Sequence, residues 1–180
     1  MKKILLIFAI CLCALQPKAQ NYVDFLGLQL NGNTKATFAE KLIEKGYTYQ
    51  NEKDGYVLYA GQFVGVDASV MLVPSETSDG ITAVSVSVEE LNPVKMGQLF
   101  AELVQKYMQK YADYKYTTQT QPNGSTQIMF RKNMPGGLMD FVAIESGVTG
   151  SKCKLTINYA TGIKSDTAAS DSDGISIDDI

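Results

Sequence analysis

The apolar residues of two stretches recur every three to four positions, which is the spacing of an amphipathic helix. The first stretch, 35–45, follows the turn Asn31-Gly32-Asn33-Thr34, which contains helix-capping residues. It ends before Gly46, and glycine readily adopts the left-handed conformation that often follows a helix. The second stretch, 93–112, starts at Pro93, which suits the first turn of a helix, and follows Asn92, which suits the N-terminal cap. We therefore predict two helices. Their apolar faces are Phe38, Ala39, Leu42 and Ile43 in the first, and Met96, Leu99, Phe100, Leu103, Val104, Tyr107 and Tyr111 in the second.

Shorter stretches alternate apolar and polar residues with the two-residue period of β-strands. In one of them Val84, Val86 and Val88 alternate with small or polar residues, which indicates a sheet that is covered on one face only. Polar and glycine-containing turns separate the stretches. The expected strands are 47–50, 56–63, 66–72 and 81–88 after the first helix, and 114–120, 126–132, 138–145 and 153–159 after the second.

A helix followed by four strands is thus expected twice, although the two halves share little sequence identity. Strands joined by tight turns pair antiparallel. We therefore expect an α+β fold in which tandem helix-plus-four-strand units form one antiparallel sheet with two helices packed on one face. An apolar lead-in, 21–30, is expected to dock on the core. The expected domain spans 20–162, and 163–180 is a small-residue acidic segment that we predict to be a disordered tail.

The N-terminus has the features of a secretory signal peptide. Lys2 and Lys3 precede a short apolar run that is too brief to span a bilayer as a mature helix. Cleavage is expected after Ala19, or alternatively after Gln20. A lipoprotein signal is the less favoured alternative, because the residues before the two candidate cysteines are not small; these cysteines are Cys11 and Cys13. The expected location is the periplasm or the extracellular space.

Removal of residues 1–19 changes the charge balance of the chain. Three of the 16 basic residues leave with the signal, so 13 basic and 19 acidic residues remain and the net charge is −6. This balance disfavours nucleic-acid binding, which needs a basic surface. The sequence contains no histidine, the most common general base and metal ligand, and no tryptophan, the strongest cation–π platform. We expect no cofactor and no metal.

Motifs of turn glycines and core residues are spread along the mature chain, which ends in a Ser/Asp-rich segment. The motifs are Phe25-Leu26-Gly27, Asn31-Gly32, Phe38, Leu42, Lys45-Gly46-Tyr47, Tyr59-Ala60-Gly61-Gln62-Phe63 and the final Asp178-Asp179-Ile180. They resemble a group of exported proteins of Bacteroidetes-type bacteria, and the tandem order of elements resembles the β-lactamase-inhibitor-protein fold. The resemblance implies a curved sheet whose exposed concave face binds another protein.

This chain departs from the inhibitor family at the residues that matter for its function. The inhibitor is stapled by disulfides and has tryptophans on its binding face. Here the mature chain retains only Cys153 and contains no tryptophan. We therefore carry over no inhibitory residue and no β-lactamase target, because a shared fold does not by itself give a shared function.

Two groups of residues are candidates for contact with a partner. Tyrosines concentrate in the first two expected strands, and tyrosine supplies a large contact area at low entropic cost. The simpler alternative is that about half of these tyrosines point into the core and the others are ordinary strand formers. Polar residues and a methionine lie on the uncovered face of the next two strands. The candidates are Tyr47, Tyr49, Tyr56, Tyr59, Asp67, Ser69, Met71, Ser85 and Ser87.

Other chemistry is less well supported. Glu89 with Glu90, or Asp140 with Glu145, could form a carboxylate pair for acid–base hydrolysis, but nothing predicts a cleft around them. The segment 171–174 resembles part of a calcium loop but lacks the carboxylates at its first and last positions. Cys153 is expected to be buried and inert. A three-residue pattern at Thr167 suggests O-glycosylation.

These observations lead to a functional hypothesis. We expect an exported, non-enzymatic protein-binding or scaffolding module that uses the exposed sheet face to bind another protein of the cell envelope. The alternative is a small-ligand or lipid carrier that holds its ligand between the helices and the sheet. The sequence does not indicate the oligomeric state.

Overall fold

Eight antiparallel strands form one large sheet, and two helices accompany it in an α+β fold. The computed structural model describes residues 22–121, 124–149 and 152–164, and for 89–91, 149 and 152 it describes the backbone only. The helices are α2 (Lys35–Glu44) and α3 (Pro93–Lys110). The strands of the large sheet are β3 (Thr48–Lys53), β4 (Tyr56–Phe63), β5 (Val66–Pro74), β6 (Ile81–Leu91), β7 (Lys115–Thr120), β8 (Thr126–Met134), β9 (Leu138–Thr149) and β10 (Lys152–Lys164).

Both helices begin at a side-chain cap, as the sequence predicts. The Thr34 hydroxyl accepts a hydrogen bond from the backbone N–H of Thr37 at 3.2 Å, and the Asn92 side-chain oxygen accepts one from Lys95 at 2.9 Å. Each cap satisfies a backbone donor that would otherwise lack a partner at the helix start. The predicted apolar face of the first helix is wrong at Ile43, whose side chain is exposed.

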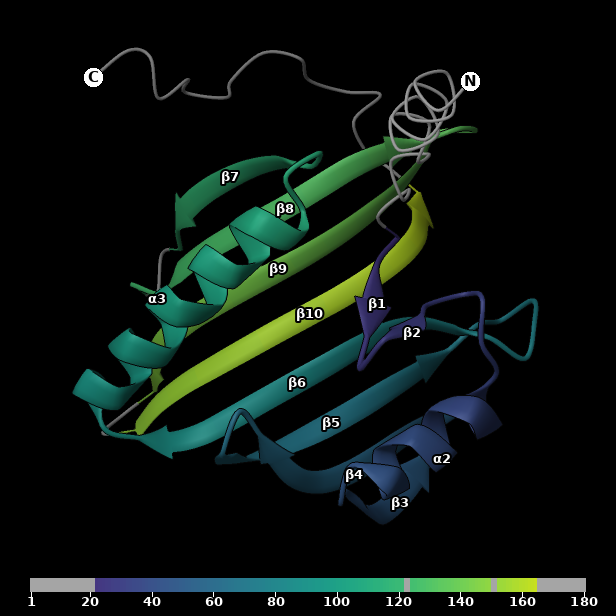
Figure 1. Cartoon of the computed structure of the whole chain (residues 1–180), viewed down its shortest axis with the longest axis horizontal. Helices are drawn as coiled ribbons and strands as arrows, with labels where there is room; N and C mark the ends of the chain where they lie inside the picture. The colour runs from purple at the N-terminus through teal and green to yellow at the C-terminus, as the bar shows by residue number, and fades with distance from the viewer. Residues whose placement is uncertain (1–21, 122–123, 150–151, 165–180) are drawn as a thin grey trace, which may run out of the picture.

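The order of strands across the sheet is β3-β4-β5-β6-β10-β9-β8-β7. Strands β6 and β10 therefore meet at its centre, although α3 and three strands separate them in the sequence. Val86 of β6 pairs with Ile157 of β10. Figure 1 shows both helices on the same face of the sheet, with α3 over the half that contains β8 and β9 and α2 over the half that contains β3 and β4. We call this the helix face, and the opposite one the open face.

A short hairpin covers the middle of the helix face. Strands β1 (Asp24–Phe25) and β2 (Leu28–Gln29) pair antiparallel and lie between the two helices in Figure 1. The side chains of Val23, Phe25 and Leu30 are buried, which confirms that the lead-in docks on the core. The N–H of Asn31 donates to the Ile81 carbonyl at 2.9 Å and fixes the hairpin to the start of β6.

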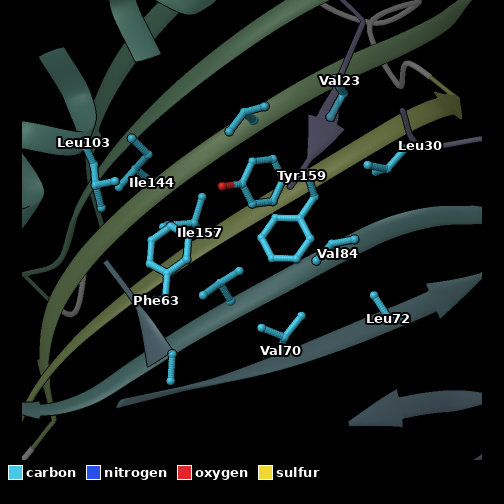
Figure 2. Packing of buried hydrophobic residues seen from close by; sticks show 14 of the residues in the cluster. Val23, Leu30, Phe63, Val70, Leu72, Val84, Leu103, Ile144, Ile157 and Tyr159 are labelled. Atoms are coloured by element: carbon cyan, nitrogen blue, oxygen red, sulfur yellow. The ribbon is translucent and has the colours of Figure 1, made fainter. Parts of the chain in front are cut away.

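The core lies between the helix face and these three covering elements. Figure 2 shows its central side chains, which come from β4, β5, β6, β9, β10, the hairpin and α3. Each fully buried aliphatic side chain contributes about 2 kcal/mol through the removal of apolar surface from water. The residues at the centre of the helix-face rows are Val70, Leu72, Val84, Val86, Val88, Ile144, Leu155 and Ile157, all with no exposed surface.

Several strands extend further than their sequence pattern predicts. β3 reaches Lys53, β9 reaches Thr149 and β10 reaches Lys164, two residues beyond the expected domain end at 162. The expected signal peptide 1–19, residues 165–180 and the glycosylation candidate Thr167 lie outside the described residues.

Candidate functional site

The open face is the candidate site, because its side chains are arranged in regular rows with no described element across them (Figure 1). Residues that pair across antiparallel strands project to the same face, so the register defines which side chains are neighbours. One row, from β4 to β8, is Ala60, Ser69, Ser87, Thr156, Glu145 and Gln127. The adjacent row is Leu58, Met71, Ser85, Asn158, Ala143 and Met129.

These two central rows are poor in charge. Their only ionisable side chain is Glu145, whose carboxylate accepts a hydrogen bond from the Ser125 hydroxyl at 2.7 Å. The other side chains are small hydroxyls, amides or apolar groups. Charged residues occupy the flanking rows instead: Asp67 lies on one side, and Arg131 pairs with Lys115 on the other. A partner would therefore meet a charge-poor centre between charged borders.

Two alanines of the open face are almost completely buried. Ala143 and Ala160 are only 2% and 3% exposed although no described element covers this face. Ala143 pairs with Asn158 and Met129, and Ala160 pairs with Phe141. Since directly opposite side chains lie about 5 Å apart, these larger neighbours shield the alanines from solvent. The result is a close-packed surface on which another molecule could rest without deep side-chain insertion.

The structure separates the candidate residues of the sequence analysis into two groups. The register and the burial pattern place on the open face Tyr56, Asp67, Ser69, Met71, Ser85 and Ser87. Tyr47 and Tyr59 are each 4% exposed and belong to the core, so for them the candidate role at a partner surface is wrong. Tyr49 pairs with Tyr59 on the helix face, where their rings meet edge to face at 5.9 Å.

Sequence reasoning missed half of the open face. Thr156 and Asn158 of β10 and Gln127 and Met129 of β8 continue the rows of Ser87 and Ser85. The alternation of 153–159 indicated polar residues on one side of its strand. Nothing local indicated that this strand pairs with β6, because that contact joins positions some 70 residues apart.

The carboxylate pair considered for hydrolysis does not converge. Asp140 is 2% exposed, pairs with Lys132 on the helix face, and accepts hydrogen bonds from the Thr161 hydroxyl at 2.7 Å and the Gly162 N–H at 3.0 Å. Glu145 lies on the open face. Asp140 therefore holds the end of β10 in place. The side chains of Glu89 and Glu90 lie outside the described residues.

Tyrosines form a cluster on the helix face. The Tyr107 and Tyr159 hydroxyls hydrogen-bond to each other, and the Tyr111 ring lies 5.8 Å from that of Tyr107. Burial raises the pKa of Tyr107 to about 12 and also raises the pKa values of Tyr111 and Tyr159 well above their ordinary value. The Tyr111 hydroxyl is buried without a hydrogen-bond partner among the described residues, although the Asp24 backbone lies near enough to lower its pKa slightly. These neutral rings act as core.

The described residues include neither a group of side chains that could hold a metal ion nor an exposed thiol. Within 22–121, 124–149 and 152–164, no three His, Cys, Asp or Glu side chains are grouped so that they could hold a metal ion. Cys153 is a free thiol and is 2% exposed, which confirms the predicted burial. None of the described helices is both long and apolar enough to span a membrane.

Comparison with known proteins adds no relative. No protein-family model, no curated protein and no solved structure matches this chain. The resemblance drawn from short motifs in the sequence therefore stays a prediction, and the case for function depends on the open face itself.

Proposed function

We propose that this protein is a non-enzymatic module that binds another protein through the open face of its sheet. The observation that supports this proposal is the charge-poor centre of that face, where Glu145 is the only ionisable group in two rows that cross six strands. The centres of protein interfaces are depleted in charge relative to the rest of the surface, because a buried unpaired charge is costly.

The sizes of the side chains favour the same function. Ser69, Ser85 and Ser87 lose little conformational entropy when a partner covers them, whereas an ordered lysine or glutamate loses up to about 2 kcal/mol. Their hydroxyls can both donate and accept hydrogen bonds. Met71, which is 36% exposed, adds an adaptable apolar contact beside them.

We further propose that the partner is a protein of the cell envelope. The support is the N-terminal pattern of Lys2, Lys3 and a short apolar run, which is typical of a cleaved signal peptide. We also infer that the domain consists of two tandem units. Each helix is followed by four strands, and the last strand of each set, β6 or β10, lies at the centre of the sheet.

A carrier function has less support. A ligand between helices and sheet would have to displace the hairpin, because the Phe25 ring contacts the Tyr159 ring with centroids 5.3 Å apart. Both residues are at most 3% exposed. Native mass spectrometry of the protein purified from its own cells tests this alternative, since a carrier should retain a small molecule.

Site-specific photo-cross-linking tests the binding function. A photo-reactive phenylalanine analogue replaces Ser87 at the centre of the open face, or Gln105 on the exposed side of α3 as the matched control. We expect the Ser87 probe to yield a discrete cross-linked protein in envelope preparations, and the Gln105 probe to yield none.

The captured protein is then purified and titrated against charge variants. Ser85→Arg combined with Ser87→Arg should weaken binding at least about tenfold, because two unpaired cations would be buried at the contact. Gln105→Arg should leave the affinity unchanged. Equal capture by both probes, or undiminished binding by the Ser85/Ser87 variant with a native circular dichroism spectrum, would refute the function proposed here.

A further inference from the structure

The two free edges of the sheet differ in how they are protected. At β3 the pairing register shifts between Tyr49 and Asn51, and the strand ends in Glu52 and Lys53. The Glu52 carboxylate lies 2.7 Å from the Lys35 ammonium of α2. Bulges and charged side chains are the common means by which proteins keep edge strands from pairing with other chains.

β7 at the other edge has little of this protection. Its six residues pair with β8 in unbroken register, from Lys115 opposite Arg131 to Thr120 opposite Thr126. The strand contains no proline and one charge, at its first residue, and its threonines and tyrosine favour strands. Every second residue of an edge strand points its N–H and C=O outward, and no described strand pairs with the outer edge of β7. β7 therefore offers a regular set of backbone donors and acceptors.

An aromatic row of the core also ends at this edge. Ring contacts connect Phe25, Tyr159, Tyr107, Tyr111, Phe130 and Tyr116, with neighbouring centroids 5.3–6.3 Å apart. Phe130 is 1% exposed, whereas Tyr116, the last ring, is 48% exposed on β7. The row thus presents an apolar surface directly beside unpaired backbone groups.

We propose that β7 pairs with β7 of a second copy of this chain, so that two sheets join into one continuous antiparallel sheet. A two-fold axis perpendicular to the sheet keeps equivalent faces on the same side, so each residue must pair with one of the same face. A register centred on Thr117 satisfies this condition. It places Tyr116 opposite Thr118 of the second copy and brings the two Tyr116 rings into diagonal contact, about 7–8 Å apart at the backbone.

The centred register also avoids electrostatic conflict. Lys115, the only charged residue of β7, faces Gln119 of the second copy, and the threonines at the axis face each other. Cross-strand threonine pairs and aromatic–threonine pairs are favourable in sheets. Pairing of β7 with β3 of another copy would instead be head-to-tail and would give an open-ended assembly. It would also have to accommodate the bulge between Tyr49 and Asn51 of β3.

This inference goes beyond the binding function, because it concerns the sheet edge and not the open face. The two-fold operation places both open faces on one side of the dimer. A dimeric partner could then engage both copies at once and gain avidity without any new contact.

Sedimentation velocity of the full chain after export, over a range of concentrations, tests the dimer. Thr117→Lys places two ammonium groups opposite each other at the axis and should weaken dimerisation at least about tenfold. Thr48→Lys is the control on the other edge strand, because Thr48 is an exposed threonine of β3, whereas Thr117 is a half-buried threonine of β7. Thr117→Glu should likewise be monomeric, and a mixture of the Lys and Glu variants should form a heterodimer.

The outcomes are decisive in both directions. Pairing through β7 is supported if the wild type forms a concentration-dependent dimer that Thr117→Lys disrupts and Thr48→Lys leaves intact. The mixture of the Thr117→Lys and Thr117→Glu variants should then restore the dimer. A wild type that stays monomeric up to about millimolar concentration refutes it, as does a dimer that survives both Thr117 substitutions. Restoration in the mixture shows that the single variants are folded, so loss of dimer cannot be attributed to unfolding.

Discussion

Substitution of Gly61 by alanine provides a direct test of the packing that removes Tyr47 from the candidate surface. A Cβ atom on Gly61 would lie 2.5 Å from Cδ1, 2.8 Å from Cγ and 3.0 Å from Cα of Tyr47. The ring cannot swing away into solvent without losing its burial, since Tyr47 is only 4% exposed. Because a backbone atom is also in contact, the start of β3 must shift away from β4.

The expected cost follows from two opposing terms. Overpacking of a close-packed site costs about 1–3 kcal/mol. Replacing glycine by alanine also reduces the backbone freedom of the unfolded chain, which stabilises the folded protein by about 0.4–1 kcal/mol. The net expectation for Gly61→Ala is a loss of about 1–2 kcal/mol in the free energy of unfolding, measured by urea denaturation followed by circular dichroism.

Gly97 supplies a control with the opposite sign. It lies inside α3, and a Cβ there would meet nothing within 4 Å. Gly97→Ala should therefore stabilise the protein by about 0.5–1 kcal/mol through helix propensity. In a Tyr47→Ala background, Gly61→Ala should cost less than in the wild type, because only the contact with the Cα atom at position 47 remains. The reasoning fails if Gly61→Ala is as stable as wild type, or if its cost is the same with and without the Tyr47 ring.

Three further predictions address strain, ionisation and buried hydrogen bonds. Val64 is β-branched and has a φ of 51°, a left-handed conformation that asparagine adopts more easily. Val64→Asn should therefore raise the free energy of unfolding by about 1 kcal/mol and the urea midpoint with it, and an unchanged midpoint would show that the turn carries no strain. Burial raises the pKa of Tyr107 to about 12, above its unfolded value of about 10, so the stability that Tyr107 contributes should be fully present below about pH 10 and fall by about 1.4 kcal/mol per pH unit between pH 10 and 12. The free energy of unfolding of Tyr107→Phe should therefore fall less steeply over this range, and equal slopes for the variant and the wild type would contradict this. Asp140→Ala should cost about 2–4 kcal/mol in thermal or urea unfolding, because it removes the buried carboxylate that accepts from the half-buried Gly162 N–H and the Thr161 hydroxyl, whereas a loss under about 0.5 kcal/mol would mean that these contacts are dispensable.

The periodicity of the chain predicts its elements well because it reports local physics. The caps at Thr34 and Asn92 and the strand 56–63 agree with the structure, since each depends on residues within a few positions. Ile43 shows the limit of this reasoning. It continues the apolar stripe of its helix, but Leu42 occupies the buried side of the last turn and Ile43 is exposed, so tertiary packing decides which side of the stripe is buried.

The assembly of the open face could not be predicted in the same way. Alternation shows that Ser85 and Ser87 share a face. It does not show which strand lies beside them, because that depends on which two distant strands pair at the centre of the sheet. Pairing of β6 with β10 brings Thr156 beside Ser87, and no local pattern specifies that choice. Likewise, Tyr47 is core rather than surface because Gly61 leaves room for its ring, a relationship between two strands that strand propensity does not contain.

The composition of the open face is not explained by folding alone. Threonine, valine and tyrosine favour exposed strand positions, whereas serine and alanine do not, yet Ser69, Ser85 and Ser87 occupy neighbouring positions on the central strands. A solvated sheet face could instead carry lysines and glutamates in favourable cross-strand pairs. Small neutral side chains forgo that stabilisation and leave the backbone accessible to a flat surface. This is the feature expected where another molecule completes the second layer of the sheet, and the cross-linking probe at Ser87 examines that position directly.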